Sequence, residues 1–160
     1  LKKTENLQLT THNLPLTDYD WRVGKIAKDF YETKFGKGTF SANKTKELLT
    51  TNHNFNTLLR FVIPTETIGY CICYENDDIL HYSYPFFIIQ NSKFKIQNLG
   101  AGMMLKAIIY AKEAGKKYVY LGSTKDAKAK YKLQFVGLEW FDGEKWENDV
   151  NELKKILISA

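Results

Sequence analysis

One stretch, residues 95–122 with the sequence KIQNLGAGMMLKAIIYAKEAGKKYVYLG, limits the possible folds of this chain more than any other. Its apolar residues recur at spacings of three and four, which predicts a helix with one face packed on a sheet. The residues of this predicted inward face are Leu99, Met103, Ala107, Tyr110, Ala111 and Ala114. Gly115 is expected to end the helix, and the YVYL run that follows is typical of a buried strand. Loop, helix and strand are therefore expected to form one unit.

Two glycines, Gly100 and Gly102, lie where this helix is expected to begin. A helix N-terminus carries unpaired backbone N–H groups and the positive end of the helix dipole, so it suits an anion. We predict a phosphate-binding loop here, in which a β-carbon would block the close approach of anion and backbone. Its residues are Gln97, Asn98, Leu99, Gly100, Ala101, Gly102 and Met103.

The composition predicts one globular domain with no membrane span. The chain has 160 residues, 44% of them hydrophobic, and no run of about eighteen apolar residues. The start, LKKTENLQLTTHN, lacks the apolar region of a signal peptide, so we expect a cytoplasmic protein without a membrane partner. Cys71 and Cys73 lie two apart in a strand-like run, which favours two buried thiols over a disulfide. No metal site is expected, because the histidines show no ligand spacing.

Positive charge is concentrated in one part of the chain. The net charge of the whole chain is +5, whereas residues 93–132 alone hold ten lysines against two acidic residues. A positive field beside a phosphate-binding loop suits a polyanionic ligand such as coenzyme A or tRNA. The alternative interpretation is an ordinary solvated lysine-rich surface.

The first residues predict a helix that follows an irregular segment. Residues 1–16 show no period and are expected to be a lead-in to a domain of residues 17–160. Thr17, with Asp20 three residues later, resembles a helix cap, so a helix is expected to run to about Tyr31. Its predicted inward residues are Trp21, Val23, Ile26 and Phe30.

A second helix and three strands are expected next. Ser41 is predicted to cap a short helix, so that two helices precede any strand. Residues 57–64, 67–74 and 79–89 are rich in β-branched and aromatic side chains, and their short connections predict an antiparallel meander. Pro85 within the third strand indicates a bulge or an edge.

The last part of the chain predicts a helix, a hairpin and a helix. Residues 123–135 read as helical, and Asp142 and Gly143 between apolar runs indicate a hairpin turn. A final helix is expected from residue 148 or 149, with Val150, Leu153, Ile156 and Leu157 facing inward. Together the elements predict an α/β fold with a mixed sheet.

Gln97, Gly100 and Gly102 spell Q-x-x-G-x-G, which resembles the pyrophosphate loop of the GNAT acyltransferases. The resemblance implies the GNAT-like (acyl-CoA N-acyltransferase) fold, a mixed and mostly antiparallel sheet flanked by helices in a single domain. In that fold a bulge just before the glycine loop opens a cleft between two splayed parallel strands. The predicted irregularity at Pro85 extends the resemblance beyond the loop.

The runs YVYLG at residues 118–122 and KAKYKLQF at residues 128–135 resemble a narrower family. Arginyl-tRNA and leucyl-tRNA protein transferases have Y-Y-Y-L-G and K-M-R-Y-K-x-Q-F in their C-terminal catalytic domain. Lys130 then stands for arginine and Ala129 for methionine. This resemblance implies an aminoacyl group transferred from charged tRNA to a protein or peptide.

The resemblance also implies roles for residues that follow the strand predicted at YVYL, residues 118–121. In GNAT enzymes a tyrosine at the start of the following helix faces the leaving group of the donor, so Tyr131 is the candidate acid. Its alternative role is ordinary packing of an amphipathic ring. Lys128, Lys130 and Lys132 are candidate contacts to phosphate or nucleic acid, although alternate spacing on a helix does not point all three the same way.

The residues do not single out a general base. Glu66, Glu75 and His81 are candidates, each with an ordinary surface or sheet role as the alternative. Aromatic side chains of the third strand line either an acceptor cleft or the core; they are Tyr82, Tyr84, Phe86 and Phe87.

Three functions are compatible with these residues. The first is aminoacyl transfer from charged tRNA, the second is acetyl-CoA-dependent N-acetylation, and the third is a non-catalytic tRNA- or protein-binding module. The first two need a donor substrate but no tightly bound cofactor, and an acceptor with a free amine. Gly102→Val is expected to abolish donor binding and to leave the fold intact. The oligomeric state stays open.

Overall fold

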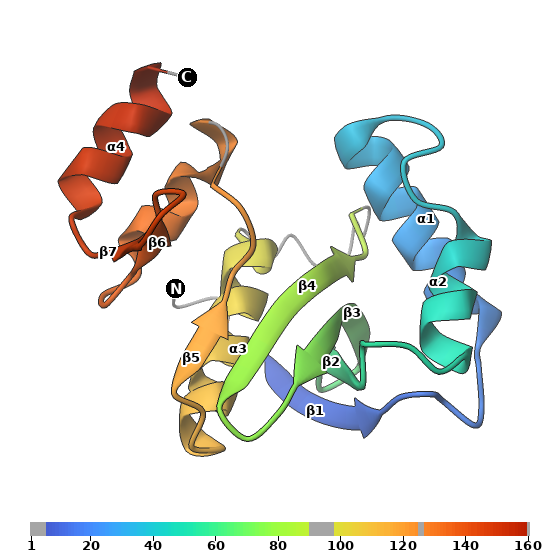
Figure 1. The fold of residues 1–160 in the computed structure, drawn as a ribbon. Helices are drawn as coiled ribbons and strands as arrows, with labels where there is room; N and C mark the ends of the chain where they lie inside the picture. The colour runs from blue at the N-terminus through green and yellow to red at the C-terminus, as the bar shows by residue number, and fades with distance from the viewer. Residues whose placement is uncertain (1–5, 90–97, 125–126, 160) are drawn as a thin grey trace. The chain divides into compact units, whose positions relative to one another are not determined.

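The computed structural model describes residues 6–89, 98–124 and 127–159, which belong to two compact units, Leu1–Tyr120 and Leu121–Ala160. The first unit is a five-stranded sheet with helices packed on it (Figure 1). Its elements are β1 (Gln8–Asn13), α1 (Trp21–Phe35), α2 (Ala42–Thr50), β2 (Thr57–Ile63), β3 (Glu66–Glu75), β4 (Ile79–Phe87), α3 (Leu99–Glu113) and β5 (Tyr118–Tyr120). Within the described ranges, no helix is long and apolar enough to cross a membrane.

The sheet is mixed and mostly antiparallel, as the sequence predicts. Its strand order is β1-β2-β3-β4-β5; β1 to β4 pair antiparallel, and β5 pairs parallel with β4. The strands predicted at residues 57–64, 67–74 and 79–89 are β2, β3 and β4, with ends that differ by no more than two residues. Short polar connections can join only antiparallel neighbours, which explains why this part was predictable.

The strand β1 corrects the expectation that two helices precede any strand. It pairs along its whole length with β2, from Gln8 opposite Val62 to Asn13 opposite Thr57. Leu7, just before it, is only 2% exposed. Side chains on an edge strand are mostly exposed, so β1 has little apolar period, and its place depends on backbone pairing that the sequence does not display.

The helix α1 begins at a different cap from the one expected. Asp20 is the N-cap, and its carboxylate accepts a hydrogen bond from the Arg22 N–H at 2.9 Å, so the prediction of Thr17 was wrong. Trp21, the first residue of the helix, is 68% exposed rather than buried. Ser41 caps α2 as predicted, since its hydroxyl accepts from the Lys44 N–H at 3.0 Å.

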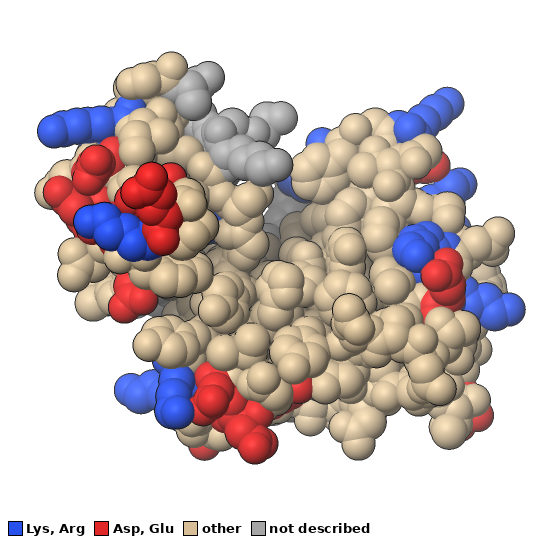
Figure 2. Space-filling view, in the orientation of Figure 1, with Lys and Arg blue, Asp and Glu red and all other residues tan. Residues whose placement is uncertain are grey.

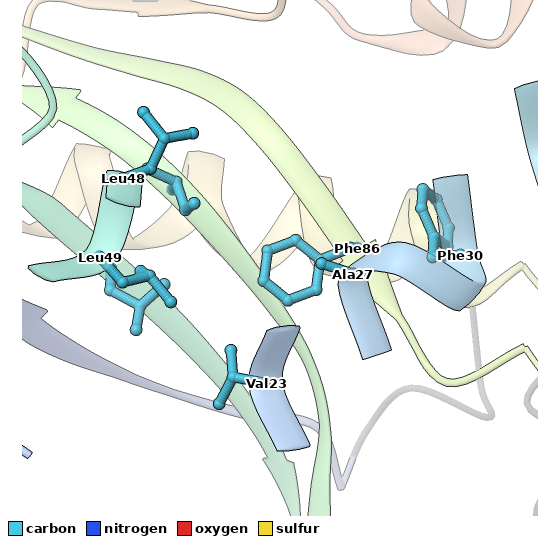
Figure 3. Close-up of a cluster of buried hydrophobic side chains, with 8 residues drawn as sticks. Val23, Ala27, Phe30, Leu48, Leu49 and Phe86 are labelled. Carbon is cyan, nitrogen blue, oxygen red and sulfur yellow. The ribbon is translucent and has the colours of Figure 1, made fainter. Parts of the chain in front are cut away.

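One core fills the space between α1, α2 and the sheet (Figure 3). Phe86 of β4 lies fully buried between side chains of both helices. The other buried members are Val23, Ala27, Phe30, Leu48, Leu49, Leu58 and Ile72. Of the predicted inward residues of α1, Val23 and Phe30 are therefore confirmed, whereas Ile26 is only partly buried.

The helix α3 packs against β1, β4 and β5. Five of its six buried residues lie at the predicted spacing or beside it: Leu99, Met103, Met104, Ala107 and Ala111. Gly115 follows the helix with φ of +74°, which confirms its predicted role as the helix stop. Ala114 is exposed because it is the C-cap, so its predicted inward position was wrong. Cys71 and Cys73 are buried free thiols, as expected.

The second unit contains a 3-10 helix, a hairpin and a final helix. Its elements are η2 (Ala127–Gln134), β6 (Trp140–Phe141), β7 (Trp146–Glu147) and α4 (Val150–Ser159). The predicted hairpin is confirmed: the Asp142 carboxylate accepts from the N–H groups of Glu144 and Lys145 at 2.7 and 2.8 Å. In α4 the residues Leu153 and Leu157 are buried, whereas Ile156 is exposed, contrary to its predicted position.

Candidate active site

The parallel pairing of β4 and β5 is short. The two strands pair at only three positions, the last being His81 opposite Tyr120, and β4 then continues to Phe87 beside β3. The register of β3 and β4 shifts at Ser83, which is the extra residue of a bulge. The bulge lies two residues before Pro85, which itself pairs with Cys71. Of the described strands, only β3 pairs with β4 at Pro85, so the edge position predicted for the proline is confirmed.

The helix α3 starts with backbone N–H groups that form no hydrogen bond within the helix. Asn98 is the N-cap in the left-handed conformation, with φ of 61°, and its side chain forms no capping hydrogen bond. The first hydrogen bond of the helix runs from the Gly102 N–H to the Asn98 carbonyl oxygen at 3.0 Å. The N–H groups of Leu99, Gly100 and Ala101 precede it, so no carbonyl of the helix accepts from them. Those three N–H groups are the best-placed donors for an anion.

Both glycines of the loop also have a packing role. A β-carbon on Gly100 would lie 3.3 Å from a ring carbon of Phe87, which is tighter than ordinary contact. Gly102 is buried, so a valine there would have to displace its neighbours, and Gly102→Val is unsuited to separating binding from folding. Gln97 lies outside the described residues, so the Q-x-x-G-x-G loop is described only from Asn98 onward.

The positive charge of residues 93–132 is partly neutralised. The Lys116 ammonium pairs with the Glu75 carboxylate at 3.0 Å, and these side chains are only 11% and 15% exposed. Lys117 pairs with Asp78 at 2.8 Å. Figure 2 shows blue and red side chains together at this lower edge of the first unit, where α3 ends. Because Lys116 and Lys117 are paired with acidic residues, they add little to the positive field at the other end of α3, where the helix begins. The ten lysines counted in the sequence therefore overstate that field.

Glu75 is held by a network within the first unit. Besides Lys116, it accepts hydrogen bonds from the Tyr110 hydroxyl at 2.9 and 3.1 Å and from the Thr57 hydroxyl at 3.2 Å. Burial, with the hydrogen bond to Glu75, raises the pKa of Tyr110 to about 12. Three donors thus occupy the carboxylate, which suits a structural role better than the proton transfer considered for it.

His81 lies in the last of the three pairs between β4 and β5. Its ring meets the Tyr120 ring edge-on, with 6.1 Å between centroids. Burial lowers the pKa of the imidazole. Two of the four aromatic candidates of β4, Tyr82 and Phe86, are buried, which favours the core interpretation for them. Tyr84 and Phe87 are partly buried.

The second unit carries the candidate acid and the candidate phosphate contacts. Tyr131 lies on η2 with an exposed side chain, and partial burial raises its pKa. Lys130 is exposed, and Lys128 lies in the same helix. Lys132 is 5% exposed, its ammonium donates to the Ser123 carbonyl oxygen at 2.7 Å, and burial lowers its pKa. The approach of Tyr131 to the start of α3 stays a prediction.

Comparison with known proteins finds two leucyltransferases. The chain is 26% identical over 156 residues to an aspartate/glutamate leucyltransferase of Chromohalobacter salexigens, a match that spans 92% of this chain and 61% of the relative. It is 35% identical over 86 residues to the enzyme of the same name from Dinoroseobacter shibae, which spans 52% of this chain and 29% of the relative. The chain thus covers less than two thirds of either relative. No protein-family model matches it.

Solved structures agree on the fold. A probable acetyltransferase from methicillin-resistant Staphylococcus aureus matches with a TM-score of 0.53 at 13% identity, over 87% of this chain and 94% of the other. An aminoglycoside acetyltransferase from an uncultured soil metagenomic sample matches with a TM-score of 0.52 at 14% identity, over 90% and 97%. A GNAT family acetyltransferase from Staphylococcus aureus matches with a TM-score of 0.52 at 16% identity, over 86% and 98%. The chain therefore has the GNAT fold.

Proposed function

We propose that this chain carries the acyl-transfer site of an enzyme that moves an aminoacyl group from charged tRNA to the free amine of a protein or peptide. The observation that carries this proposal is the match to two leucyltransferases, one of which spans 92% of the chain. The YVYLG and KAKYKLQF runs agree with it. Leucine is accordingly the first amino acid to test, and acceptors that begin with aspartate or glutamate are the first acceptors.

Transfer of an aminoacyl group from an ester requires a bound donor, an acceptor amine that has lost its proton, and an acid for the leaving oxygen. The acceptor nitrogen attacks the ester carbonyl, the new C–N bond forms, and the C–O bond to the ribose of the tRNA breaks. Tyr131 is proposed to give its proton to the departing ribose oxygen, for which a raised pKa keeps the hydroxyl protonated at neutral pH. The N–H groups of Leu99, Gly100 and Ala101 are proposed to hold a donor phosphate.

The proposed contribution of the lysines differs among the three. Lys130, with an exposed side chain, is suited to a phosphate contact. The ammonium of Lys132 already donates to Ser123, so a phosphate contact there would have to replace or share this bond. Lys128 belongs to the same proposed set.

Acetyl-CoA is the second candidate donor. Two observations favour it: the short parallel pairing of β4 with β5, and the N–H groups at the start of α3 that form no hydrogen bond within the helix. The same arrangement can hold the pyrophosphate of coenzyme A, because an anion at a helix N-terminus needs only backbone donors. The donor is a substrate in either case, and neither candidate requires a tightly bound cofactor.

A donor screen separates these functions. The protein is incubated with radiolabelled leucyl-tRNA, arginyl-tRNA or acetyl-CoA and with peptides that begin with aspartate, glutamate or alanine. We expect label to move from leucyl-tRNA to the acidic acceptors, and Tyr131→Phe to slow this transfer. Transfer from acetyl-CoA alone would replace the first function by the second.

Absence of transfer from every donor would contradict both catalytic functions. Binding is then measured by thermal shift, since a donor at about a hundred times its dissociation constant adds roughly 2.7 kcal/mol to stability. A shift with tRNA in the absence of any transfer would identify a tRNA-binding module.

A further inference from the structure

His81 is the centre of a row of three rings that crosses the sheet. On β3, Tyr74 lies directly opposite His81, and on β5 Tyr120 does. Directly opposed residues of neighbouring strands project from the same face of a sheet, so the three side chains lie side by side. The rings of His81 and Tyr120 are in edge contact.

This row faces away from α3. Met103 of α3 lies against Gly69 of β3, which marks the α3 face of that strand. Tyr74 is five residues further along β3, and an odd separation puts it on the opposite face. Figure 2 shows few Lys, Arg, Asp and Glu side chains in the middle of the front of the first unit, the side opposite α3. The row therefore belongs to a weakly charged face of the sheet.

The row also lies where the parallel ladder of β4 and β5 ends. His81 and Tyr120 form the last pair of the parallel ladder, and the bulge at Ser83 follows two residues later. The Ser83 hydroxyl donates to the carbonyl oxygen of His81 at 3.1 Å, which ties the bulge to the backbone of this residue. A group bound against β4 between His81 and the bulge would have the imidazole of His81 beside it.

The imidazole is suited to accept a proton. Its pKa is lowered by burial, so the ring is neutral near pH 7 and one nitrogen keeps its lone pair. The side chains that face it from β3 and β5 are those of Tyr74 and Tyr120, and neither is a carboxylate. Among the described residues, no carboxylate forms an ion pair with His81 that would hold it protonated.

We propose that His81 is the general base that takes the proton from the acceptor amine. This inference rests on the acyl transfer proposed above. As the amine nitrogen forms its bond to the acyl carbon, its N–H proton passes to the free ring nitrogen of His81. The electron pair of the breaking bond leaves with the donor oxygen or sulfur, which receives its own proton from the candidate acid. The imidazolium then releases its proton to water and the tyrosinate of the acid takes one from water, so the enzyme returns to its starting state.

The test compares His81→Gln with His12→Gln. His12 is a histidine of the same sheet and lies on β1, the edge strand at the other end from β5. We expect His81→Gln to lower the transfer rate by about 10²- to 10⁴-fold, the usual range for a general base, with donor affinity and melting temperature unchanged. Below the pKa of His81, the logarithm of the wild-type rate should fall with a slope near two, because both the imidazole and an α-amino group of pKa about 8 must lose a proton. The slope of His81→Gln should be near one, and His12→Gln should behave as wild type.

Rescue of a variant by added imidazole distinguishes a general base from a residue with a structural role. In His81→Ala, added imidazole should restore part of the rate in proportion to its unprotonated fraction. Wild-type transfer together with an unchanged rate in His81→Gln overturns the assignment of His81 and leaves the proposed function standing. A slower variant that keeps the slope near two and is not rescued also overturns it. If wild-type protein transfers nothing from any donor, both proposals fail.

Discussion

A β-carbon on Gly69 of β3 would lie 2.8 Å from the sulfur of Met103 on α3 and 2.9 Å from the β-carbon of Phe87 on β4. Real β-carbons do not approach other atoms so closely, so helix and sheet meet here with no room for a side chain. Because α3 begins four residues before Met103, the position of the candidate anion site depends on this contact.

Gly69→Ala is therefore expected to destabilise the first unit by about 1–3 kcal/mol, the usual cost of overpacking a core. The measurement is unfolding in urea. In a Met103→Ala background the cost should be smaller, because one of the two clashing neighbours is removed. Strictly additive effects of the two substitutions would contradict the contact.

Ala101→Glu should change stability and donor binding in opposite directions. A carboxylate in the first turn of α3 interacts favourably with the helix dipole, by about 0.3–1 kcal/mol, so the melting temperature should rise slightly. The same charge repels a donor phosphate at the N–H groups of Leu99 and Gly100, so donor affinity should fall. Ala101→Gln is the control of equal size, and it should bind more tightly than Ala101→Glu. Equal affinity of the two variants would place the phosphate elsewhere.

Tyr110→Phe should cost about 1.5–3 kcal/mol, the range for a hydrogen bond to a charged group, because the Glu75 carboxylate loses a donor. Tyr118→Phe, at an exposed position, is the control and should cost little. The pKa of Tyr110 is raised to about 12 in the folded protein, above the unfolded value of about 10. Its stabilising contribution is therefore complete below pH 10 and is lost as the pH rises through 12. An alkaline urea series on both variants measures this.

Lys132 gives the opposite sign of pH dependence. Burial lowers its pKa in the folded protein, so between that pKa and the unfolded value of about 10.4 the unfolded state binds more protons. The stability of the wild type relative to Lys132→Met should therefore rise as the pH increases through this window. Lys130→Met, at an exposed lysine, should show no such trend. A difference between wild type and Lys132→Met that does not vary from pH 7 to pH 10 would contradict the burial of the ammonium.

Local signals predicted the elements whose causes are local. The cap at Ser41 and the turn at Asp142 each involve residues two or three apart, and both were found as expected. The helix stop at Gly115 needs only a left-handed residue, which glycine supplies. The three strands between residues 57 and 87 follow from their side chains and short connections.

Several features that the sequence did not predict depend on relations between distant residues. The strand β1 is held by β2 across two helices, and its own side chains give no period. Lys116 entered the sequence analysis only as one of the ten lysines of residues 93–132, whereas it pairs with Glu75, which is forty-one residues earlier. The exact position of the bulge, at Ser83 rather than Pro85, also depends on register with β3. No local pattern contains this information.

For the candidate site, the start of α3 was predictable because glycines mark it. The N-cap at Asn98 and the engagement of the Gly102 N–H were not, because capping geometry depends on the path of the chain before the helix. The row of Tyr74, His81 and Tyr120 was also out of reach, since it requires the register of three strands.

The pairing of β1 with β2 has a consequence for the order in which the strands can pair during synthesis. β1 is synthesised before α1 and α2, but its partner follows them, so its backbone donors and acceptors wait unpaired until β2 has emerged. The meander β2-β3-β4 needs only neighbouring segments and can form first. During that interval β2 is an open edge, with a free row of N–H and C=O groups that another chain could pair with. Docking of β1 closes that edge, so this polar strand acts as an internal guard against aggregation.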